Sequence, residues 1–202
     1  MAELVLVRHG ETEWSRTGRH TGVTDLALTA HGTDQARALG RVLAGRTFGL
    51  VLASPRLRAQ QTADLAGLTS READEDLVEW DYGAYEGRTT EEISAELGIS
   101  WEVFDEGTVP GETPGETVEQ VAARARAVLE RVTPVLAAGG DVALVGHGHQ
   151  LRVLLTQWLG LEPRSGAMFR LDAGTLSTLG LEHDIPAVRT WNVPVGSAVA
   201  RT

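Results

Sequence analysis

The feature that most constrains this chain is an apolar run near the N-terminus that ends in an arginine and a histidine. Residues 4–7 read Leu-Val-Leu-Val and are followed by Arg8, His9 and Gly10. A continuous apolar run of this length is typical of a parallel strand buried on both faces, and ligands of open α/β sheets bind at the carboxyl ends of such strands. The arginine offers a planar, permanently charged guanidinium group, and the histidine can act as a nucleophile or a base. The glycine leaves room for a ligand near the backbone. The group therefore predicts a phosphate site.

The same pattern occurs a second time, at residues 141–149. An apolar run there leads to Gly146, His147 and Gly148. If both strands belong to one sheet, they lie side by side and present His9 and His147 to one pocket. A lone histidine in a loop is more often a hydrogen-bonded structural residue, but the repeated strand-histidine-glycine pattern favours a functional pair.

Length and composition predict a single cytoplasmic domain over residues 1–202. This length suits one sizeable core, no apolar run reaches the length of a membrane span, and the first residues lack the pattern of a signal peptide. The absence of cysteine excludes disulfides and a cysteine-dependent phosphatase mechanism. All 18 basic residues are arginines, which excludes Schiff-base chemistry and a P-loop lysine, and the net charge of −10 speaks against binding nucleic acid or anionic membranes.

The hydrophobic pattern predicts a three-layer α/β/α sandwich with a mostly parallel central sheet. Four helices are expected: one over residues 30–43, one that begins at Pro55, and two more over 117–138 and 151–159. Thr29 is expected to cap the first of them, and Val42 is among its core-facing positions. Further strands are expected over residues 50–53 and, more weakly, 71–77, with edge strands, some of them antiparallel, at 169–171, 175–181 and 187–192. Residues 194–202 are expected to form a loose tail.

Residues 83–118 are predicted to form a small helical lid beside the pocket. The stretch is helical in pieces and is broken at residues 110–115, which are rich in proline and glycine. Between residues 89 and 123 the chain has nine carboxylates and no basic residue. Such a lid would repel highly charged substrates.

Two further strand ends carry candidate site residues. The strand over 50–53 leads into a helix whose N-terminus is a ready anion site, and of Arg56 and Arg58 only one is expected to enter the pocket. Glu79 lies nearest the end of the strand expected over 71–77 and is the natural general acid, with Glu86 as a second candidate.

Other residues are expected to lie on the substrate side of the pocket. The polar, glycine-punctuated loop at residues 14–22 offers hydroxyl and N–H groups that can wrap an anion. Tyr82 belongs to an aromatic loop that is expected to wall the pocket. Arg152 follows His147 by only five residues, close enough to touch a substrate and to hold a second phosphate.

Taken together, four motifs resemble those of the histidine phosphatase superfamily, which contains the cofactor-dependent phosphoglycerate mutases. They are Arg8-His9-Gly10, residues 54–62, Glu79 before Trp-Asp-Tyr-Gly, and Gly146-His147-Gly148. The resemblance runs from about residue 4 to residue 181 and keeps the family's order and spacing. It implies that His9 becomes a phosphohistidine, that Glu79 is the proton donor, and that the remaining pocket residues are Arg8, Arg58 and His147. It also implies that Ser15, Thr21 and Gly22 line the substrate side, to which the residues themselves add Tyr82 and Arg152.

Two departures favour the phosphatase branch of this family over the mutases. Ser15 stands where the mutases often have asparagine, and the residue 89–123 segment lacks the basic residues with which mutases bind a second charged group. This branch includes acid phosphatases of actinobacterial type and the sedoheptulose-bisphosphatase of yeast. The resemblance thus implies a hydrolase of small phosphomonoesters, such as sugar phosphates, that needs no cofactor.

Several alternatives stay open at this stage. The chain could instead be a phosphoglycerate mutase or a noncatalytic phosphate-binding module, and a homodimer is compatible with the sequence. A metal site formed by His147 and His149 is not expected, because Gly148 between them indicates a turn rather than a strand that would align them. The sequence leaves the leaving group of the substrate undetermined.

Overall fold

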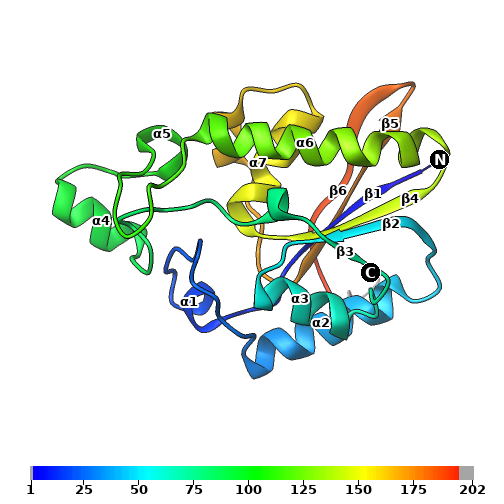
Figure 1. Cartoon of the computed structure of the whole chain (residues 1–202), viewed down its shortest axis with the longest axis horizontal. Coiled ribbons are helices and arrows are strands. Elements are labelled where there is room, and N and C mark those ends of the chain that lie inside the picture. Colours follow the sequence, from blue (N-terminus) through cyan, green and yellow to red (C-terminus); the bar gives the residue numbers. More distant parts are fainter. Residues whose placement is uncertain (1, 196–202) are drawn as a thin grey trace, which may run out of the picture.

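A six-stranded sheet with helices on both faces forms the body of the computed structural model, which describes residues 2–195 (Figure 1). Strands β1 (Leu4–Arg8), β2 (Phe48–Ala53), β3 (Glu72–Ala73) and β4 (Asp141–Gly146) are parallel, in the order β3-β2-β4-β1. The antiparallel strands β5 (Thr175–Glu182) and β6 (Ile185–Pro194) continue the sheet beyond β1. The expected mostly parallel α/β architecture is confirmed.

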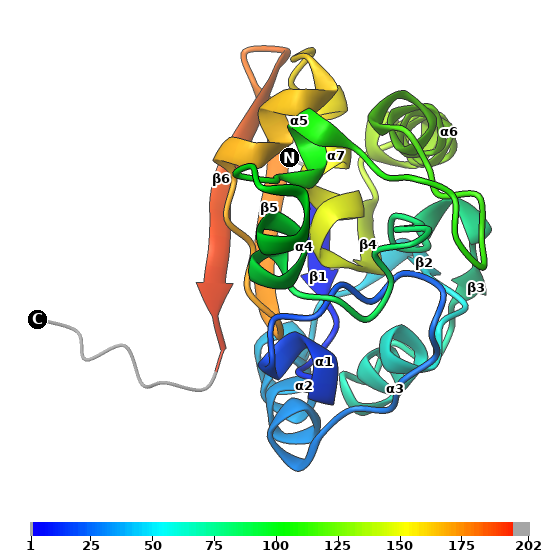
Figure 2. The same ribbon diagram turned by 90° about the vertical axis from the view of Figure 1, so that its left-hand side faces the viewer.

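The helices cover the sheet in two layers, which Figures 1 and 2 show on opposite faces. Helices α2 (Ala30–Leu43) and α3 (Leu57–Leu65) cover one face, and α6 (Val118–Ala137) and α7 (Gly148–Trp158) cover the other. Successive side chains of β1 enter different cores: Val5 and Val7 join the core under α2, and Leu4 and Leu6 join the core under α6. Burial on both faces is the reason that β1 reads as an unbroken apolar run.

Local capping signals predict the ends of two long helices correctly. Thr29 caps α2 by accepting a hydrogen bond from the N–H of Gly32 (3.0 Å). Thr117, at which the sequence predicts this helix to start, caps α6 in a capping box with Gln120, and α6 ends at Ala137, one residue before the predicted end. No helix within residues 2–195 is long and apolar enough to cross a membrane.

The predicted strand over residues 71–77 is wrong for most of its length. Strand β3 has only two residues, and a 3-10 helix (η1, Glu75–Leu77) follows it. The carboxylate of Asp74 accepts a hydrogen bond from the N–H of Asp76 (2.9 Å), which favours a turn over further strand pairing. Glu79 therefore follows a turn and not the end of a strand.

Two helices start at residues other than those expected. Helix α3 begins at Leu57, after an extended Arg56, and not at Pro55. Helix α7 begins at Gly148, three residues before the expected start, with His147 as its extended N-cap. The glycine at position 148 indicated a turn, but in the structure it is the first helical residue.

The C-terminal region agrees with the prediction in part. Residues 169–171 do not form the expected strand; they follow a 3-10 helix (η2, Pro163–Met168) in irregular structure. The two predicted antiparallel strands exist and are longer than predicted, and Pro194 belongs to β6, but only β6 lies at the edge of the described sheet, because β5 pairs with both β1 and β6. Most of the expected tail at residues 194–202 lies outside the described residues.

Residues 83–118 cross the end of the molecule at which the parallel strands terminate (Figure 1). They contain α4 (Thr90–Leu97) and α5 (Val103–Glu106), while α1 (Glu13–Arg16) lies in the loop after β1. Tyr85 and Trp101 of this segment are buried in the same core as α6 and α7. The segment is therefore packed on the domain through its aromatic side chains.

Helix α2 offers a matched test of the core. Leu39 is fully buried, whereas Val42, which was expected to face the core, is 54% exposed. Leu39→Ala should lower the free energy of unfolding by about 2–5 kcal/mol, because it leaves a cavity, while Val42→Ala should change it by less than about 0.5 kcal/mol. Urea unfolding measures both variants, and equal losses would contradict this assignment of the core-facing side.

Candidate active site

The candidate site lies at the carboxyl ends of β1, β2 and β4. The N–H of His9 donates to the carbonyl of Gly146 (3.0 Å), so the residue after β1 is paired with the last residue of β4. This pairing brings the rings of His9 and His147 to 5.0 Å between centroids. Arg8 ends β1, and Arg58 lies in the first turn of α3, after β2.

His9 is held in the tautomer that a nucleophile requires. Its Nδ1 lies 2.7 Å from the carbonyl oxygen of Gly10, which can only accept, so Nδ1 carries the proton and Nε2 keeps its lone pair. Burial, together with the charges of Arg58 and Arg8, holds the pKa of His9 well below its usual range. The neutral imidazole is therefore the resting form.

Close packing explains why position 10 is a glycine. A Cβ atom at this position would lie 2.4 Å from the carbonyl oxygen of Gly32, so helix α2 approaches the backbone too closely for a side chain. The N–H of Gly10 donates to the hydroxyl of Thr62 (3.0 Å). Gly10 thus lets the backbone beside His9 pack closely against α2 and α3. The sequence suggested a different role for it, which was to leave room for a ligand.

Arg58 and His147 form a buried polar chain beside His9. The Nε of Arg58 donates to Nδ1 of His147 (3.1 Å), and His147 Nε2 lies 2.8 Å from the hydroxyl of Ser54. Since arginine only donates, Nδ1 accepts, and the neutral ring donates from Nε2 to Ser54. The other guanidinium nitrogens of Arg58 donate to carbonyls of the loop after α1, at Thr21, Gly22 and Thr24.

Arg8 keeps an unsatisfied donor. Its NH1 donates to the carbonyl of Leu171, but its buried Nε has no hydrogen-bond partner within residues 2–195. A Cβ atom on Gly148 would lie 3.1 Å from the guanidinium carbon of Arg8, so this glycine lets Arg8 pass under the start of α7. A buried guanidinium with a spare N–H group is suited to an anion.

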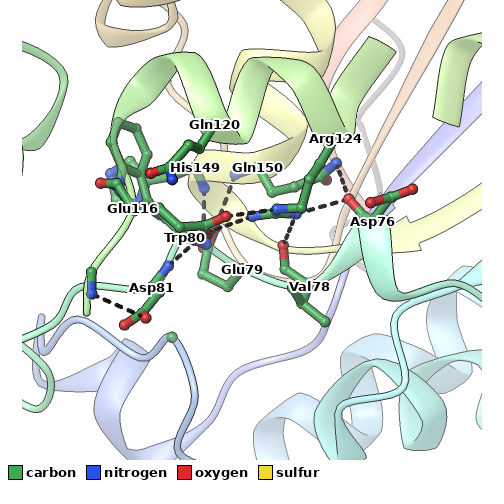
Figure 3. Close-up of polar contacts among 12 residues, drawn as sticks. Asp76, Val78, Glu79, Trp80, Asp81, Glu116, Gln120, Arg124, His149 and Gln150 are labelled. Carbon is green, nitrogen blue, oxygen red and sulfur yellow. Dashed lines mark hydrogen bonds and ion pairs between the residues drawn. The ribbon is translucent and has the colours of Figure 1, made fainter. Parts of the chain in front are cut away.

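Backbone N–H groups hold the carboxylate of Glu79 (Figure 3). Oε1 accepts from the N–H groups of Trp80 (3.0 Å) and Gln150 (2.9 Å), and Oε2 accepts from the N–H of His149 (3.1 Å). Two of these donors belong to the first turn of α7, whose N–H groups have no partner within the helix. Both lone pairs of Oε1 are occupied, so a proton carried by Glu79 belongs on Oε2.

An ion pair fixes the backbone on both sides of Glu79 (Figure 3). Arg124 of α6 donates to the carbonyls of Asp76 (2.9 Å) and Val78 (3.1 Å). The same guanidinium binds both carboxylate oxygens of Glu116, each at 2.8 Å. Glu116 in turn accepts from the N–H of Asp81 (3.0 Å). The chain before and after Glu79 is thus tied to a single helix.

These groups border a small cavity of about 150 Å³. His9, Arg8 and Glu79 all line it, so an imidazole, a guanidinium and a carboxyl group share one space. The remaining lining residues are Ser15, Gly18, Arg19, His20, Thr21, Tyr82 and His149. Arg58 and His147 are fully buried behind this wall.

Three of the expected substrate-side residues line the cavity, namely Ser15, Thr21 and Tyr82. Gly22 lies outside its wall, where its N–H donates to the carboxylate of Glu86 (2.9 and 3.0 Å). Glu86, the second candidate acid, is thereby bound to backbone away from the cavity.

Arg152 also lies outside the cavity wall. Its guanidinium donates to the carbonyls of Gly166 (2.9 Å) and Ala167 (3.0 Å) and lies 4.6 Å from the ring centre of Phe104. Its proximity to His147 in sequence gave no indication of these contacts, because they depend on the 3-10 helix that follows α7.

The sequence did not single out Arg19, His20 or His149 as substrate-side residues, yet all three line the cavity. The sequence points to His149 only as a potential metal ligand, but in the structure its Nδ1 lies 2.6 Å from the hydroxyl of Tyr82, whereas Nδ1 of His147 accepts from Arg58. The two histidines therefore have separate partners. The sequence signal for a histidine pair is the spacing of His147 and His149 on either side of Gly148, which in a strand would place both side chains on one face. This spacing does not align the two rings here, because Gly148 is the first residue of helix α7.

Comparison with known proteins gives a consistent result. The model of the histidine phosphatase superfamily, branch 1, matches residues 4–194. The chain is 38% identical to an acid phosphatase of Mycobacterium tuberculosis, over 90% of this chain and 88% of that protein, and 34% identical to the sedoheptulose 1,7-bisphosphatase of Saccharomyces cerevisiae, over 78% and 67%. A solved structure of an open reading frame product from Mycobacterium tuberculosis superposes with a TM-score of 0.88 at 37% identity, covering 96% of this chain and 98% of that one.

The buried histidines should make the protein less stable in acid. Burial holds the pKa values of His9, His147 and His149 well below the usual 6.5 and lowers that of His20 to about 4. In the unfolded chain these rings take up protons below about pH 6.5, so the free energy of unfolding should fall between about pH 7 and pH 5. Each ring contributes at most about 1.4 kcal/mol per pH unit.

Urea unfolding at several pH values measures this effect. His20→Asn should make the fall with pH shallower, because the unfolded chain then takes up one proton fewer. His183→Asn is the control, since His183 has a side chain that is 90% exposed. Stability that stays constant down to about pH 5 would contradict the burial of four neutral imidazoles.

Proposed function

The chain belongs to the histidine phosphatase superfamily, and from this premise we propose that it hydrolyses small phosphomonoesters through a phosphohistidine at His9. One observation carries the proposal: His9, with Nε2 unprotonated, lines the same cavity as Arg8 and the carboxyl group of Glu79. A nucleophile, a positive charge for the phosphoryl oxygens and an acid for the leaving oxygen are the parts that two-step phosphoryl transfer requires. The similar acid phosphatase and sugar bisphosphatase support the same class of reaction.

In the first step, Nε2 of His9 attacks phosphorus and the bond between phosphorus and the ester oxygen breaks. Glu79 delivers the proton on Oε2 to the departing oxygen, which leaves as an alcohol. The bond from Nδ1 to the Gly10 carbonyl supports the positive charge that the imidazole ring gains (2.7 Å). Arg8 and Arg58, whose charges both lower the pKa of His9, supply positive charge beside the equatorial oxygens.

In the second step, water attacks phosphorus and the bond between nitrogen and phosphorus breaks. The Glu79 carboxylate takes a proton from this water on Oε2, so the acid is restored together with neutral His9 and free phosphate. Each catalytic cycle therefore returns His9 and Glu79 to their starting protonation states. We propose that no metal is needed, because the guanidinium groups of Arg8, which lines the cavity, and of the buried Arg58 already supply the charge. Full activity in the presence of a strong chelator is the expected result.

Phosphate release from a substrate panel tests the function, with His9→Ala as the control. The panel holds an aryl phosphate, sugar mono- and bisphosphates and 3-phosphoglycerate. Release by the wild-type protein should be lost in His9→Ala, because no other cavity side chain replaces the nucleophile. Conversion of 3-phosphoglycerate to its 2-isomer without phosphate release would show a mutase instead. Phosphate binding without any turnover would show a noncatalytic module.

Replacement of Glu79 should affect substrates according to their leaving groups. Glu79→Gln keeps a similar shape but cannot donate a carboxylic proton, so kcat for an alkyl phosphate should fall by about 10²–10⁴-fold. For p-nitrophenyl phosphate the loss in the first step should be much smaller, because nitrophenolate leaves without a proton. Rapid-quench measurement of the first turnover separates the steps, and equal losses for both substrates would contradict the role of Glu79 as acid.

Arg124→Met should show a weaker form of the same pattern, because Arg124 binds the backbone before Glu79 directly and the backbone after it through Glu116. We expect a loss of about tenfold in kcat on an alkyl phosphate, a smaller loss on p-nitrophenyl phosphate, and little change in KM. Arg126→Met is the matched control on α6, since Arg126 is exposed and its guanidinium donates to Oε1 of Gln157 (2.8 Å). A uniform loss on both substrates would indicate a purely structural role.

A further inference from the structure

The part of the cavity that faces the leaving group is a site distinct from the phosphate-binding residues. We call it the outer pocket and define it by residues Ser15, Gly18, Arg19, His20, Thr21, Tyr82 and His149, which line the cavity together with Arg8, His9 and Glu79. Among these seven residues, Arg19 carries the one permanent charge. Whether the outer pocket accepts an anionic leaving group therefore depends on what Arg19 already binds.

Arg19 is committed to the segment at residues 83–118. Its NH1 donates to the carbonyl of Gly87 (2.7 Å) and to Oε2 of Glu92 (3.0 Å), and its NH2 donates to Oε1 of Glu92 (3.1 Å). Glu92 is itself fixed, because its carboxylate accepts the N–H of Thr89 in the capping box of α4. The positive charge of Arg19 is thus paired with a carboxylate at the edge of the outer pocket.

The other polar side chains of the outer pocket are uncharged. Burial lowers the pKa of His20 to about 4 and that of His149 well below its usual range, while burial raises the pKa of Tyr82. The ring of His20 packs 4.7 Å from the ring of Tyr82 and 5.2 Å from that of Trp101. These groups can exchange hydrogen bonds with hydroxyls and stack on apolar surface, but they offer no full positive charge to an anion.

Neighbouring arginines are also engaged. Arg88 binds Glu96 (2.5 Å) and the carbonyl of Glu92 (3.3 Å). Arg152, which the sequence suggested as a holder of a second phosphate, is bound to two carbonyls outside the cavity. An anionic group entering the outer pocket would exchange part of its hydration for uncharged groups and for an arginine whose charge is already paired with Glu92.

We propose that the outer pocket selects phosphomonoesters whose leaving group is uncharged within about three carbons of the ester oxygen, such as polyol and sugar phosphates, and that Glu92 enforces this selection by pairing with Arg19. The inference rests on the proposed hydrolysis and adds its substrate class. A charge farther along a longer substrate lies outside a cavity of 150 Å³ and is not selected against.

Two substrates of the same shape test the proposal. Glycerol 3-phosphate and 3-phosphoglycerate differ by a hydroxymethyl group in place of a carboxylate. The wild-type ratio of kcat/KM should favour glycerol 3-phosphate by about tenfold or more. A ratio of one or below, with both substrates hydrolysed, would overturn the proposal. The absence of His9-dependent phosphate release from either substrate and from an aryl phosphate would instead overturn the hydrolase itself.

Glu92→Gln tests the role of the ion pair. Glutamine keeps the capping box, so α4 should stay folded, but it leaves the charge of Arg19 unpaired. The preference for glycerol 3-phosphate should fall by about threefold or more, and adding Arg19→Met should restore it. Glu96→Gln is the matched control on the same helix, because Glu96 binds Arg88 and not Arg19. An unchanged ratio in Glu92→Gln, or an equal change in Glu96→Gln, would refute the role of Glu92.

Discussion

The parallel pairing of β1 with β4 is the constraint on which the rest of the site depends. The N–H of His9 donates to the carbonyl of Gly146, and on the next strand the N–H of Ser54 donates to the carbonyl of Val145 (2.9 Å). Buried backbone groups cannot exchange such bonds for water, so the register of the strands is fixed. The distance between the two histidine rings therefore follows from the sheet and not from side-chain preferences.

Burial then decides the charge of each group in the site. An acidic chain of net charge −10 gathers Arg8 and Arg58 beside two imidazoles that stay neutral because they are desolvated and lie near these guanidinium groups. Carbonyls of the loop after α1 stabilise Arg58 without cancelling its charge. The positive charge thus stays available in a medium of low dielectric constant, where it acts strongly on a phosphoryl group.

Helix α7 links the two halves of the proposed chemistry. Its N-cap is His147, beside His9, and its first N–H groups bind the carboxylate of Glu79. Arg124 of α6 fixes the backbone of Glu79 from the other side. Glu79 is therefore positioned by two helices that also contribute side chains to the core.

The sequence by itself determined the fold class, the helix ends at Thr29 and Thr117, the family resemblance and the strand ends that carry His9 and His147. These features depend on local order, in which apolar runs, caps and glycines lie next to the residues that they position. Only the tertiary structure decided the turn before Glu79, the early start of α7 and the partners of Arg19, Arg124 and Arg152. Most of those partners lie on other elements of the fold, as Glu92 does for Arg19, and a long arginine side chain has many acceptors within reach. Tertiary packing selects among these acceptors, because it decides which carbonyls and carboxylates lie beside each guanidinium group.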